Sequence, residues 1–515
     1  MNVYARIIAT TIVAATLGCG AAYADVDDTK PFVYVVNVTA PCSETLSELL
    51  AAGFNIGSLH DRTATLYLSE SEYGELLSFG YTTQLVETQP CPYASDKTIG
   101  YTAPDEIGAL FASYAQTYPD LCRVYSLGTS VQGRDIWAIK ITPAPDTPAD
   151  KPVVKYISTM HGDEPVGTEM CLYFAEELLT EYGTDAYITD FLDRTIVWLV
   201  PMMNPDGFLA NSRFNANNKD LNRTFPSYGN DYTGTWFDGE PLGDTGREPE
   251  VIHIMQWNAS THAALSANMH TGALVVNYPY DNDPGIPSGT EAPTPDDAMF
   301  QYISLQYSMR NQPMYASTKY SQGIVNGSDW YSITGGMMDW HYRFMGCPHV
   351  TLELSDTKRP APSLLPQYWA ENRDSMFAYA ETAHIGVRGL TRDRNSDAPV
   401  WAKVLLEDNE QPVFSNPDFG NYHKLALAGT YNVSFHAEGY ISYYVDDVVV
   451  NEGPATRVDV ELSDGDINND GVVNSTDIQL VVDAVLGRAI PFDADVDGRG
   501  LSATAIQAVI NQSLL

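Results

Sequence analysis

The sequence predicts an α/β domain with a mixed sheet flanked by helices, followed by an all-β region and a small α module with a calcium loop. Between residues 99 and 385, short apolar runs alternate with amphipathic helical segments, which is typical of α/β proteins. Between residues 386 and 463, polar and apolar residues alternate as they do in half-buried strands. Residues 464–515 hold eight aspartates and only two arginines. A small α+β unit is expected before residue 99.

Residues 1–24 have the pattern of a secretory signal peptide. Arg6 supplies the positive start, an apolar run follows from Ile7 to Leu17, and Ala22-Tyr23-Ala24 is a suitable cleavage site. The apolar run is too short to remain as a membrane anchor, and no later segment is apolar enough to span a bilayer. We therefore expect a secreted, extracellular protein without a membrane span; a periplasmic or surface-attached location is the alternative.

Residues 25–98 are predicted to form the N-terminal α+β unit. Val33–Val38 and Thr63–Leu68 alternate as strands do, and Glu44–Ala52 has helical spacing. The unit is either a removable prodomain or a fixed accessory domain. The sequence does not decide between the two.

The balance of charge and the cysteine count narrow the classes of partner and of cross-link. With 66 acidic and 28 basic residues, the net charge of −38 argues against nucleic acid as a partner. Five cysteines would remain after signal cleavage, so at least one of them has no partner within the chain. Cys42 and Cys91 could form a bridge around the N-terminal unit.

The α/β region is expected to place its polar side chains at the ends of strands. The predicted elements are, in order, a strand at 153–159, a helix at 168–182, a strand at 197–203, a helix at 249–257, strands at 265–269 and 350–354, and a helix at 364–384. Several polar motifs follow directly after these strands. Open α/β sheets bind their ligands at such an edge.

His161, Glu164 and His270 are candidate metal ligands. Two neutral imidazoles and one carboxylate form the ligand set of a catalytic zinc site with one open position. His161 and Glu164 are three residues apart, so one turn can direct both at a single point, and His270 follows a distant strand. An isolated motif of this kind also arises by chance on a protein surface. The neighbouring motifs therefore decide its meaning.

Five further motifs follow the first histidine in a fixed order. They are Asn204-Pro-Asp-Gly207, Asp220-Leu-Asn-Arg-Thr-Phe-Pro226, Ser266-Ala-Asn-Met-His270 with Asn277-Tyr-Pro-Tyr-Asp281, Asp329-Trp-Tyr331 with Gly335-Gly336, and Thr351-Leu-Glu-Leu-Ser355. From about Tyr101 to Ile385 this series resembles the zinc metallocarboxypeptidase family, especially the regulatory branch with carboxypeptidases N, E, D and M. The resemblance implies that residues 99–385 bind one catalytic Zn²⁺ and hydrolyse the C-terminal bond of peptides or proteins.

The resemblance also implies roles for single residues. Glu353 matches the general base, and a carboxylate within an apolar strand is an unfavourable placement unless it has a function. Asn222 and Arg223 match the pair that binds the substrate's terminal carboxylate, for which a guanidinium is the fitting bidentate partner. Arg213 matches the arginine that stabilises the oxyanion, and Tyr331 matches the mobile tyrosine that closes over the substrate.

Asp281 and Met338 bear on the choice of side chain. In the regulatory branch an aspartate at the position of Asp281 favours Lys or Arg, because a buried carboxylate needs a cation. Met338 stands where that branch usually has Gln. Because methionine is apolar and adaptable, a preference broadened to neutral residues is the alternative to strict basic specificity.

The two C-terminal segments have resemblances of their own. Residues 386–463 resemble the transthyretin-like β-sandwich that follows the catalytic domain in the regulatory branch. Residues 464–515 resemble a dockerin, and their first loop has oxygen ligands at the calcium positions, namely Asp466, Asn468, Asp470, the Val472 carbonyl, Asn474 and Asp477. A second loop departs from the pattern. Asp493, Asp495, Asp497 and Gly498 fit, but Leu501 and Thr504 then occupy positions 9 and 12, whereas counting back from Gly500 puts Arg499 at position 5. We expect one Ca²⁺, a doubtful second one, and a cohesin-like partner.

Two other functions remain open at this point. The substrate could be a cell-wall muropeptide bearing a basic diamino acid, hydrolysed by the same fold. Alternatively, the chain could be a catalytically silent peptide-binding protein. That alternative predicts missing catalytic residues, whereas this sequence retains all of those named above.

Overall fold

The structure is a computed structural model that describes residues 32–39, 56–60, 63–68, 70–78, 81, 83–90, 100–228 and 246–514. The predicted signal peptide, the predicted helix at 44–52 and the cysteines Cys42 and Cys91 lie outside these residues. The chain forms two compact units, residues 1–99 and 100–515.

The first unit contains a four-stranded antiparallel sheet with the order β2-β3-β1-β4. Its elements are β1 (Phe32–Thr39), β2 (Ile56–His60), β3 (Thr63–Leu68), α2 (Glu70–Ser78) and β4 (Thr83–Pro90). Val36 and Val38 of β1 and Leu76 of α2 are fully buried. The strands predicted at 33–38 and 63–68 are present, and β2 is an additional strand.

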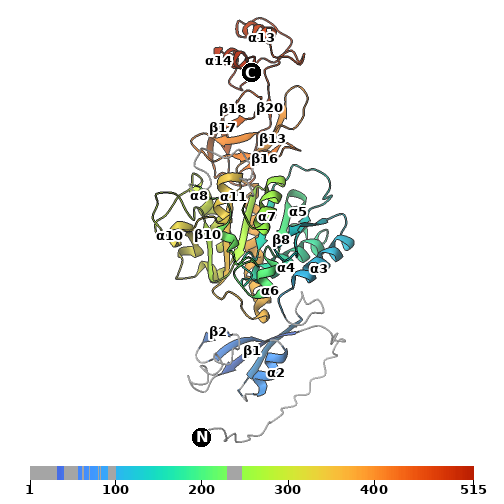
Figure 1. The fold of residues 1–515 in the computed structure, drawn as a ribbon, viewed down its shortest axis with the longest axis vertical. Helices are drawn as coiled ribbons and strands as arrows, with labels where there is room; N and C mark the ends of the chain where they lie inside the picture. The colour runs from blue at the N-terminus through green and yellow to red at the C-terminus, as the bar shows by residue number, and fades with distance from the viewer. Residues whose placement is uncertain are drawn as a thin grey trace. The chain divides into compact units, whose positions relative to one another are not determined.

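The second unit begins with an eight-stranded mixed sheet of the order β11-β10-β12-β9-β7-β8-β6-β5 (Figure 1). The strands are β5 (Cys122–Thr129), β6 (Asp135–Ile141), β7 (Val153–Ser158), β8 (Ile196–Val200), β9 (Leu265–His270), β10 (Ala273–Tyr278), β11 (Ile324–Asn326) and β12 (His349–Ser355). The central strands β12, β9, β7 and β8 run parallel to one another, and β6 and β5 are antiparallel additions. The predicted mixed sheet is therefore confirmed.

Helices cover both faces of this sheet (Figure 1). On one face Tyr156 of β7 packs edge-on against Phe174 of α4 (Val166–Glu181) and donates a hydrogen bond to the Met376 carbonyl of α12 (Leu365–Glu381). On the other face Trp198 of β8 packs against Trp257 of α7 (Pro249–Ser260), in a core shared with α11 (Met337–Met345). Buried apolar strands alternate their side chains between these two layers.

Further helices and 3₁₀ turns complete the α/β domain. They are α3 (Pro104–Thr117), α5 (Ala186–Arg194), α6 (Pro205–Ala210), α8 (Asp297–Ser308), α9 (Gln312–Tyr315), α10 (Gly327–Trp330) and the 3₁₀ turns η1 (Leu221–Arg223), η2 (Ser321–Gly323), η3 (Pro362–Leu364) and η4 (Thr382–His384). Cys122, Cys171 and Cys347 are buried free thiols. No helix among the described residues is both long and apolar enough to cross a lipid bilayer.

Residues after 386 form two four-stranded β-sheets and then two helices. One sheet contains β13 (Val387–Asp393), β16 (Asn421–Lys424), β19 (Thr456–Arg457) and β20 (Val460–Leu462), and the other contains β14 (Lys403–Leu406), β15 (Val413–Phe414), β17 (Gly429–His436) and β18 (Tyr443–Val450). Val404, Tyr422, Val433, Phe435 and Leu462 contribute to a shared core. The helices are α13 (Ser475–Val485) and α14 (Ala503–Gln512).

Candidate active site

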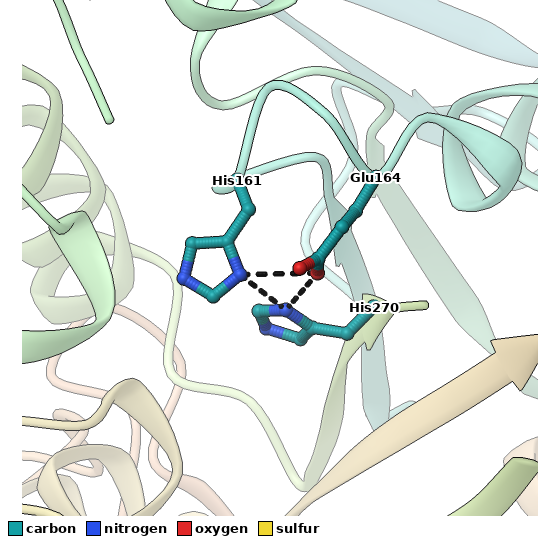
Figure 2. Close-up of side chains that lie close together, drawn as sticks. All are labelled: His161, Glu164 and His270. Atoms are coloured by element: carbon teal, nitrogen blue, oxygen red, sulfur yellow. Dashed lines mark hydrogen bonds and ion pairs between the residues drawn. The ribbon is translucent and has the colours of Figure 1, made fainter. Parts of the chain in front are cut away.

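His161, Glu164 and His270 converge at the carboxyl edge of the large sheet. His161 and Glu164 lie in the loop between β7 and α4, and His270 is the last residue of β9. Glu164 Oε2 lies 3.0 Å from His161 Nδ1 and 2.8 Å from His270 Nδ1, and the two Nδ1 atoms are 3.0 Å apart (Figure 2). No other three His, Cys, Asp or Glu side chains within the described ranges bring ligand atoms this close together. We call the point enclosed by these atoms the metal point.

The loop that carries His161 and Glu164 packs against the Asn204-Pro-Asp-Gly207 motif. Asn204 Nδ2 donates to the Met160 carbonyl, and its Oδ1 accepts from the Gly207 amide at the start of α6. Gly162 must lack a side chain, because an added Cβ would lie 1.9 Å from the Gly207 carbonyl carbon. The two glycines thus let the loop carrying His161 rest directly on the next turn.

The protonation states of His270 and Glu164 fit a divalent cation. Burial lowers the pKa of His270 to about 4, and the neutral imidazole is the form that binds metals. Burial by itself would raise the pKa of Glu164, but its hydrogen bonds with His161 and His270 outweigh burial and lower that pKa far below its ordinary value. The neutral imidazole of His270 and the ionised carboxylate of Glu164 are therefore directed at the same point as His161 Nδ1, and two imidazoles with one carboxylate are a ligand set that suits zinc.

Two residues outside the ligand set orient the imidazoles. Asp220 Oδ1 lies 3.1 Å from His161 Nε2, and Asn268 Nδ2 lies 3.2 Å from His270 Nε2. Partners on the remote ring nitrogen fix the orientation of metal-binding histidines. Sequence reasoning had assigned no role to Asp220 or Asn268, although both lie inside the motifs that it singled out.

Glu353 lies next to the metal point on β12. It is paired with His270 of β9 in the parallel register, and its side chain lines the same cavity as the three candidate ligands. Burial, with a smaller contribution from the charge of Glu164, raises the pKa of Glu353 to about 8. Its buried Oε2 atom has no hydrogen-bond partner among the described residues. The carboxyl group can therefore accept and return a proton in this cavity.

Two arginines line the cavity, and they differ in their partners. Arg213 Nε donates to Asp220 Oδ2 at 2.9 Å, and its Nη1 lies 3.1 Å from His161 Nδ1, beside the metal point. Arg223 Nη1 donates to the Asn222 carbonyl, and no carboxylate of the described chain lies within ion-pair distance of Arg223. Asn222 Oδ1 accepts from the Met337 amide, which fixes the side-chain amide at the cavity wall.

Asp281 is a buried carboxylate on the same cavity wall. It accepts a hydrogen bond from Asn277 Nδ2 at 2.9 Å and is only 3% exposed. Gly327 and Gly336 leave room for it, since an added Cβ would lie 2.1 Å from its Oδ1 at Gly327 and 3.2 Å from its Oδ2 at Gly336. Burial, together with the charge of Asp339, raises the pKa of Asp281 well above its ordinary value.

Tyr331 and Met338, the other two predicted substrate residues, lie at different depths. Tyr331 follows α10, lines the cavity and is 45% exposed, with its ring against Trp330. Met338 is buried and is not among the side chains that line the cavity. Its sulfur lies 3.8 Å from the hydroxyl of Thr351, which does line the cavity. Met338 can therefore act on a substrate only through the residues in front of it.

Comparison with known proteins gives this arrangement a family. The family model described as zinc carboxypeptidase matches residues 107–375. The chain belongs to the zinc carboxypeptidase family. Among zinc carboxypeptidases it is similar to mouse carboxypeptidase D, with 37% identity over 69% of this chain and 26% of that protein. It is also similar to mouse carboxypeptidase M, with 35% identity over 67% of this chain and 79% of that protein.

These alignments agree with the kinship to carboxypeptidases D and M predicted from the motifs. The chain spans about a quarter of the length of the carboxypeptidase D relatives. Among solved structures, the carboxypeptidase A from Helicoverpa armigera aligns with 69% of this chain and 98% of its own, at 19% identity and a TM-score of 0.46. Membership of a zinc carboxypeptidase family implies a catalytic zinc ion, and His161, Glu164 and His270 form the group that fits it.

The first acidic loop of the C-terminal segment is closed by its own carboxylates. Asp466 accepts from the amides of Asp470 and Gly471, and Asp477 accepts from those of Ile467 and Asn474. Asp466 and Asp477 are buried. The aspartates at the first and last positions of the predicted calcium loop therefore both turn into the loop.

The second acidic loop shares two internal hydrogen bonds with the first when it is counted from Gly500. The Gly500 amide donates to Asp495 Oδ1 and the Arg499 amide to Asp497 Oδ1, as Gly471 does to Asp466 and Asp470 to Asn468 in the first loop. Arg499 thus occupies the fifth position. Its guanidinium leaves the loop and lies over the Tyr444 ring at 3.7 Å and beside Glu407 Oε1 at 3.3 Å.

Proposed function

We propose that this chain is a zinc-dependent carboxypeptidase that removes C-terminal residues from peptides and prefers Lys or Arg. The observation that carries the proposal is the position of Arg223, a guanidinium without a carboxylate partner among the described residues, in one cavity with His161, Glu164 and His270. A substrate's terminal carboxylate is the partner that such a fork binds best.

This pairing makes the proposed enzyme an exopeptidase. An internal peptide bond carries no charge that could meet Arg223. Leaving one partner of a desolvated ion pair alone typically costs about 3–5 kcal/mol. Asn222 stands beside Arg223 as a second polar group for the same carboxylate, and Tyr331 can close over the bound chain end from the rim of the cavity.

The residues around the metal point would divide the work of hydrolysis. A bound Zn²⁺ would act there as a Lewis acid and lower the pKa of water to roughly 7. Glu353 would take a proton from the attacking water and return it to the leaving amine. Arg213 would donate to the carbonyl oxygen as negative charge develops on it, a role that commonly contributes about 10²–10³-fold in rate.

Asp281 supports the preference for basic residues. Its carboxylate has one side-chain donor, Asn277, and no cation within ion-pair distance among the described residues. The ammonium or guanidinium of a bound substrate would supply that cation. Met338, which contacts Thr351 from behind, puts an apolar side chain where the branch usually has a polar Gln, so a preference broadened to neutral residues stays the alternative to strict basic specificity.

The regions around the catalytic domain receive proposals of their own. We infer that the chain is exported through its N-terminal signal and that residues 386–463 are a transthyretin-like structural module. The first acidic loop would bind one Ca²⁺ through the ligands already named, and residues 464–515 would attach the enzyme to a cohesin-like partner. Arg499 argues against calcium in the second loop, since its side chain contacts the β-region instead.

One purified sample can test the central proposal. Peptides that differ only in a final Arg, Lys, Phe or Ala are incubated with the zinc-loaded chain, with and without a zinc chelator, and muropeptides are tested in parallel. We expect loss of the final Arg or Lys, faster than loss of Phe or Ala, and only with zinc. Turnover of muropeptides alone would mean that the substrate is a cell-wall peptide rather than an ordinary peptide that ends in Lys or Arg. A lack of all turnover, unchanged in Glu353→Gln, would favour the silent peptide-binding protein.

A further inference from the structure

Lys358 touches the candidate metal ligand Glu164, and neither the motifs nor the proposed mechanism uses it. Lys358 lies in the segment that follows β12, five residues beyond Glu353. Its Nζ atom lies 3.1 Å from Glu164 Oε1 and 2.9 Å from Asp163 Oδ2. The Glu164 side chain is 3% exposed, whereas that of Lys358 is 46% exposed. The lysine thus reaches from the surface to a buried carboxylate.

The two oxygens of Glu164 have separate partners. Oε2 faces the Nδ1 atoms of His161 and His270, whereas Oε1 meets Lys358 and, at 3.4 Å, Arg213 Nη1. A carboxylate can otherwise rotate about its terminal torsion, which has broad minima. A cation on one oxygen therefore fixes the plane of the carboxylate, and with it the direction of the other oxygen.

The backbone of Lys358 is tied to the segment that carries another candidate ligand. The hydroxyl of Thr271, the residue after His270, donates to the Lys358 carbonyl. The Thr271 amide also lies 3.4 Å from Glu164 Oε2. Lys358 consequently joins three separate segments around the metal point, namely the end of β9, the loop before α4 and the end of β12.

We propose that Lys358 is a positioning residue, which holds one oxygen of Glu164 and so keeps the plane of the carboxylate oriented with its other oxygen toward the metal point. This inference rests on the proposed zinc-dependent function. It concerns how the zinc site is preorganised rather than which substrate is cleaved. Asp163 would assist by holding the same ammonium from its outer side.

Lys358 has two opposing effects on the affinity for zinc, and the expected magnitudes of these effects differ. Its positive charge repels a metal ion, but a half-exposed cation is screened, and such surface effects are commonly smaller than about fivefold in affinity. Loss of a partner that orients a ligand typically weakens metal binding about 10–100-fold. Orientation should therefore dominate, and removal of Lys358 should weaken zinc binding.

The test measures zinc affinity in the whole chain by competition with a chromophoric chelator, and the visible spectrum of the cobalt-loaded protein without substrate. We expect Lys358→Met to bind zinc about 10–100-fold more weakly and to change the cobalt spectrum. Lys358→Arg should recover most of the affinity, and Asp163→Asn should lose less than Lys358→Met. Thermal unfolding of the zinc-free proteins checks that each variant folds.

Arg359→Met is the matched control, because Arg359 is the next cation along the chain and is directed to Asn211 and Phe208 instead. It should bind zinc as the unaltered chain does. Unchanged or tighter zinc binding by Lys358→Met would overturn the inference and leave the proposed function intact. Failure of the unaltered chain itself to bind zinc would overturn both.

Discussion

Glu353 and His270 lie side by side on neighbouring parallel strands, β12 and β9, at the edge of the large sheet. Because the pairing places both side chains on the same face, the proposed base and a candidate metal ligand are held by the backbone of the sheet itself. Thr351 and Asn268, two residues back along the same two strands, form the next pair on this face. The distance between the proposed base and the candidate ligand His270 is therefore set by strands, whereas His161 and Glu164 come from the loop between β7 and α4.

Replacement of Glu353 by Gln should abolish most of the catalysis without removing zinc. The amide keeps the size of the side chain but cannot accept the proton of the attacking water, so kcat should fall by about 10²–10⁴-fold. The measurement combines kcat on an Arg-ended peptide with the zinc content of the purified variant. A variant with full zinc and undiminished kcat would remove Glu353 from the mechanism.

Replacement of Asp281 by Asn should change selectivity more than rate. The neutral amide leaves a substrate cation without its partner, so kcat/KM should fall for Arg- and Lys-ended peptides and stay the same or rise for Phe-ended ones. Asp283→Asn is the control, since Asp283 is paired with Arg343 and does not line the cavity. Equal losses for all peptides would mean that Asp281 serves the fold alone.

The preference for basic residues should increase with pH. Burial and the charge of Asp339 raise the pKa of Asp281 well above its ordinary value. Burial also raises the pKa of Asp339 to about 6. A protonated pocket acid does not attract a cation, and ionisation is complete only above its pKa. Because kcat/KM reports the free enzyme, the ratio of Arg-ended to Phe-ended peptides should rise as pH increases through and above this range. In Asp281→Asn the ratio should not vary with pH.

Calcium should bind to the C-terminal segment with a stoichiometry of one. Titration calorimetry of the whole chain should give a single site, which Asp466→Ala removes and Asp495→Ala leaves unchanged. The physical reason is the ligand count, since the second loop has Arg499 where an oxygen ligand is needed. Two equivalent sites, or a site that survives Asp466→Ala, would contradict the assignment.

Much of the α/β domain could be predicted because its signals are local. The strand expected at 153–159 is β7, those at 265–269 and 350–354 are β9 and β12, and the helix at 249–257 is most of α7. Each is a continuous apolar or periodic run bounded by polar residues, so sequence spacing alone reveals it. The strands β5 and β6, which pair with each other across a short turn, were not among the predicted elements. The sheet order depends on long-range pairing, which no local pattern encodes.

The candidate site also contains residues that their motifs identify and residues that only the packed structure reveals. His161, Glu164, His270, Glu353, Arg213 and Arg223 lie together at one cavity, as their motifs implied. Asp220, Asn268 and Lys358 were assigned no role, because their contacts with His161, His270 and Glu164 become visible only in the packed structure. Met338 was expected in the pocket itself, yet Thr351 stands in front of it. Motif matching identifies positions, but only packing shows which side chain reaches the cavity.

The most direct measurement compares one Arg-ended peptide with its C-terminal amide, using the zinc-loaded chain. The account predicts that the free acid is cleaved at its last bond with a kcat/KM about 10²–10³-fold above that of the amide, because only the free acid pairs with Arg223. Arg223→Met should narrow that ratio, and zinc chelation should stop cleavage of both. Equal cleavage of acid and amide, or cleavage that persists without zinc, would contradict a zinc-dependent exopeptidase that binds the terminal carboxylate through Arg223.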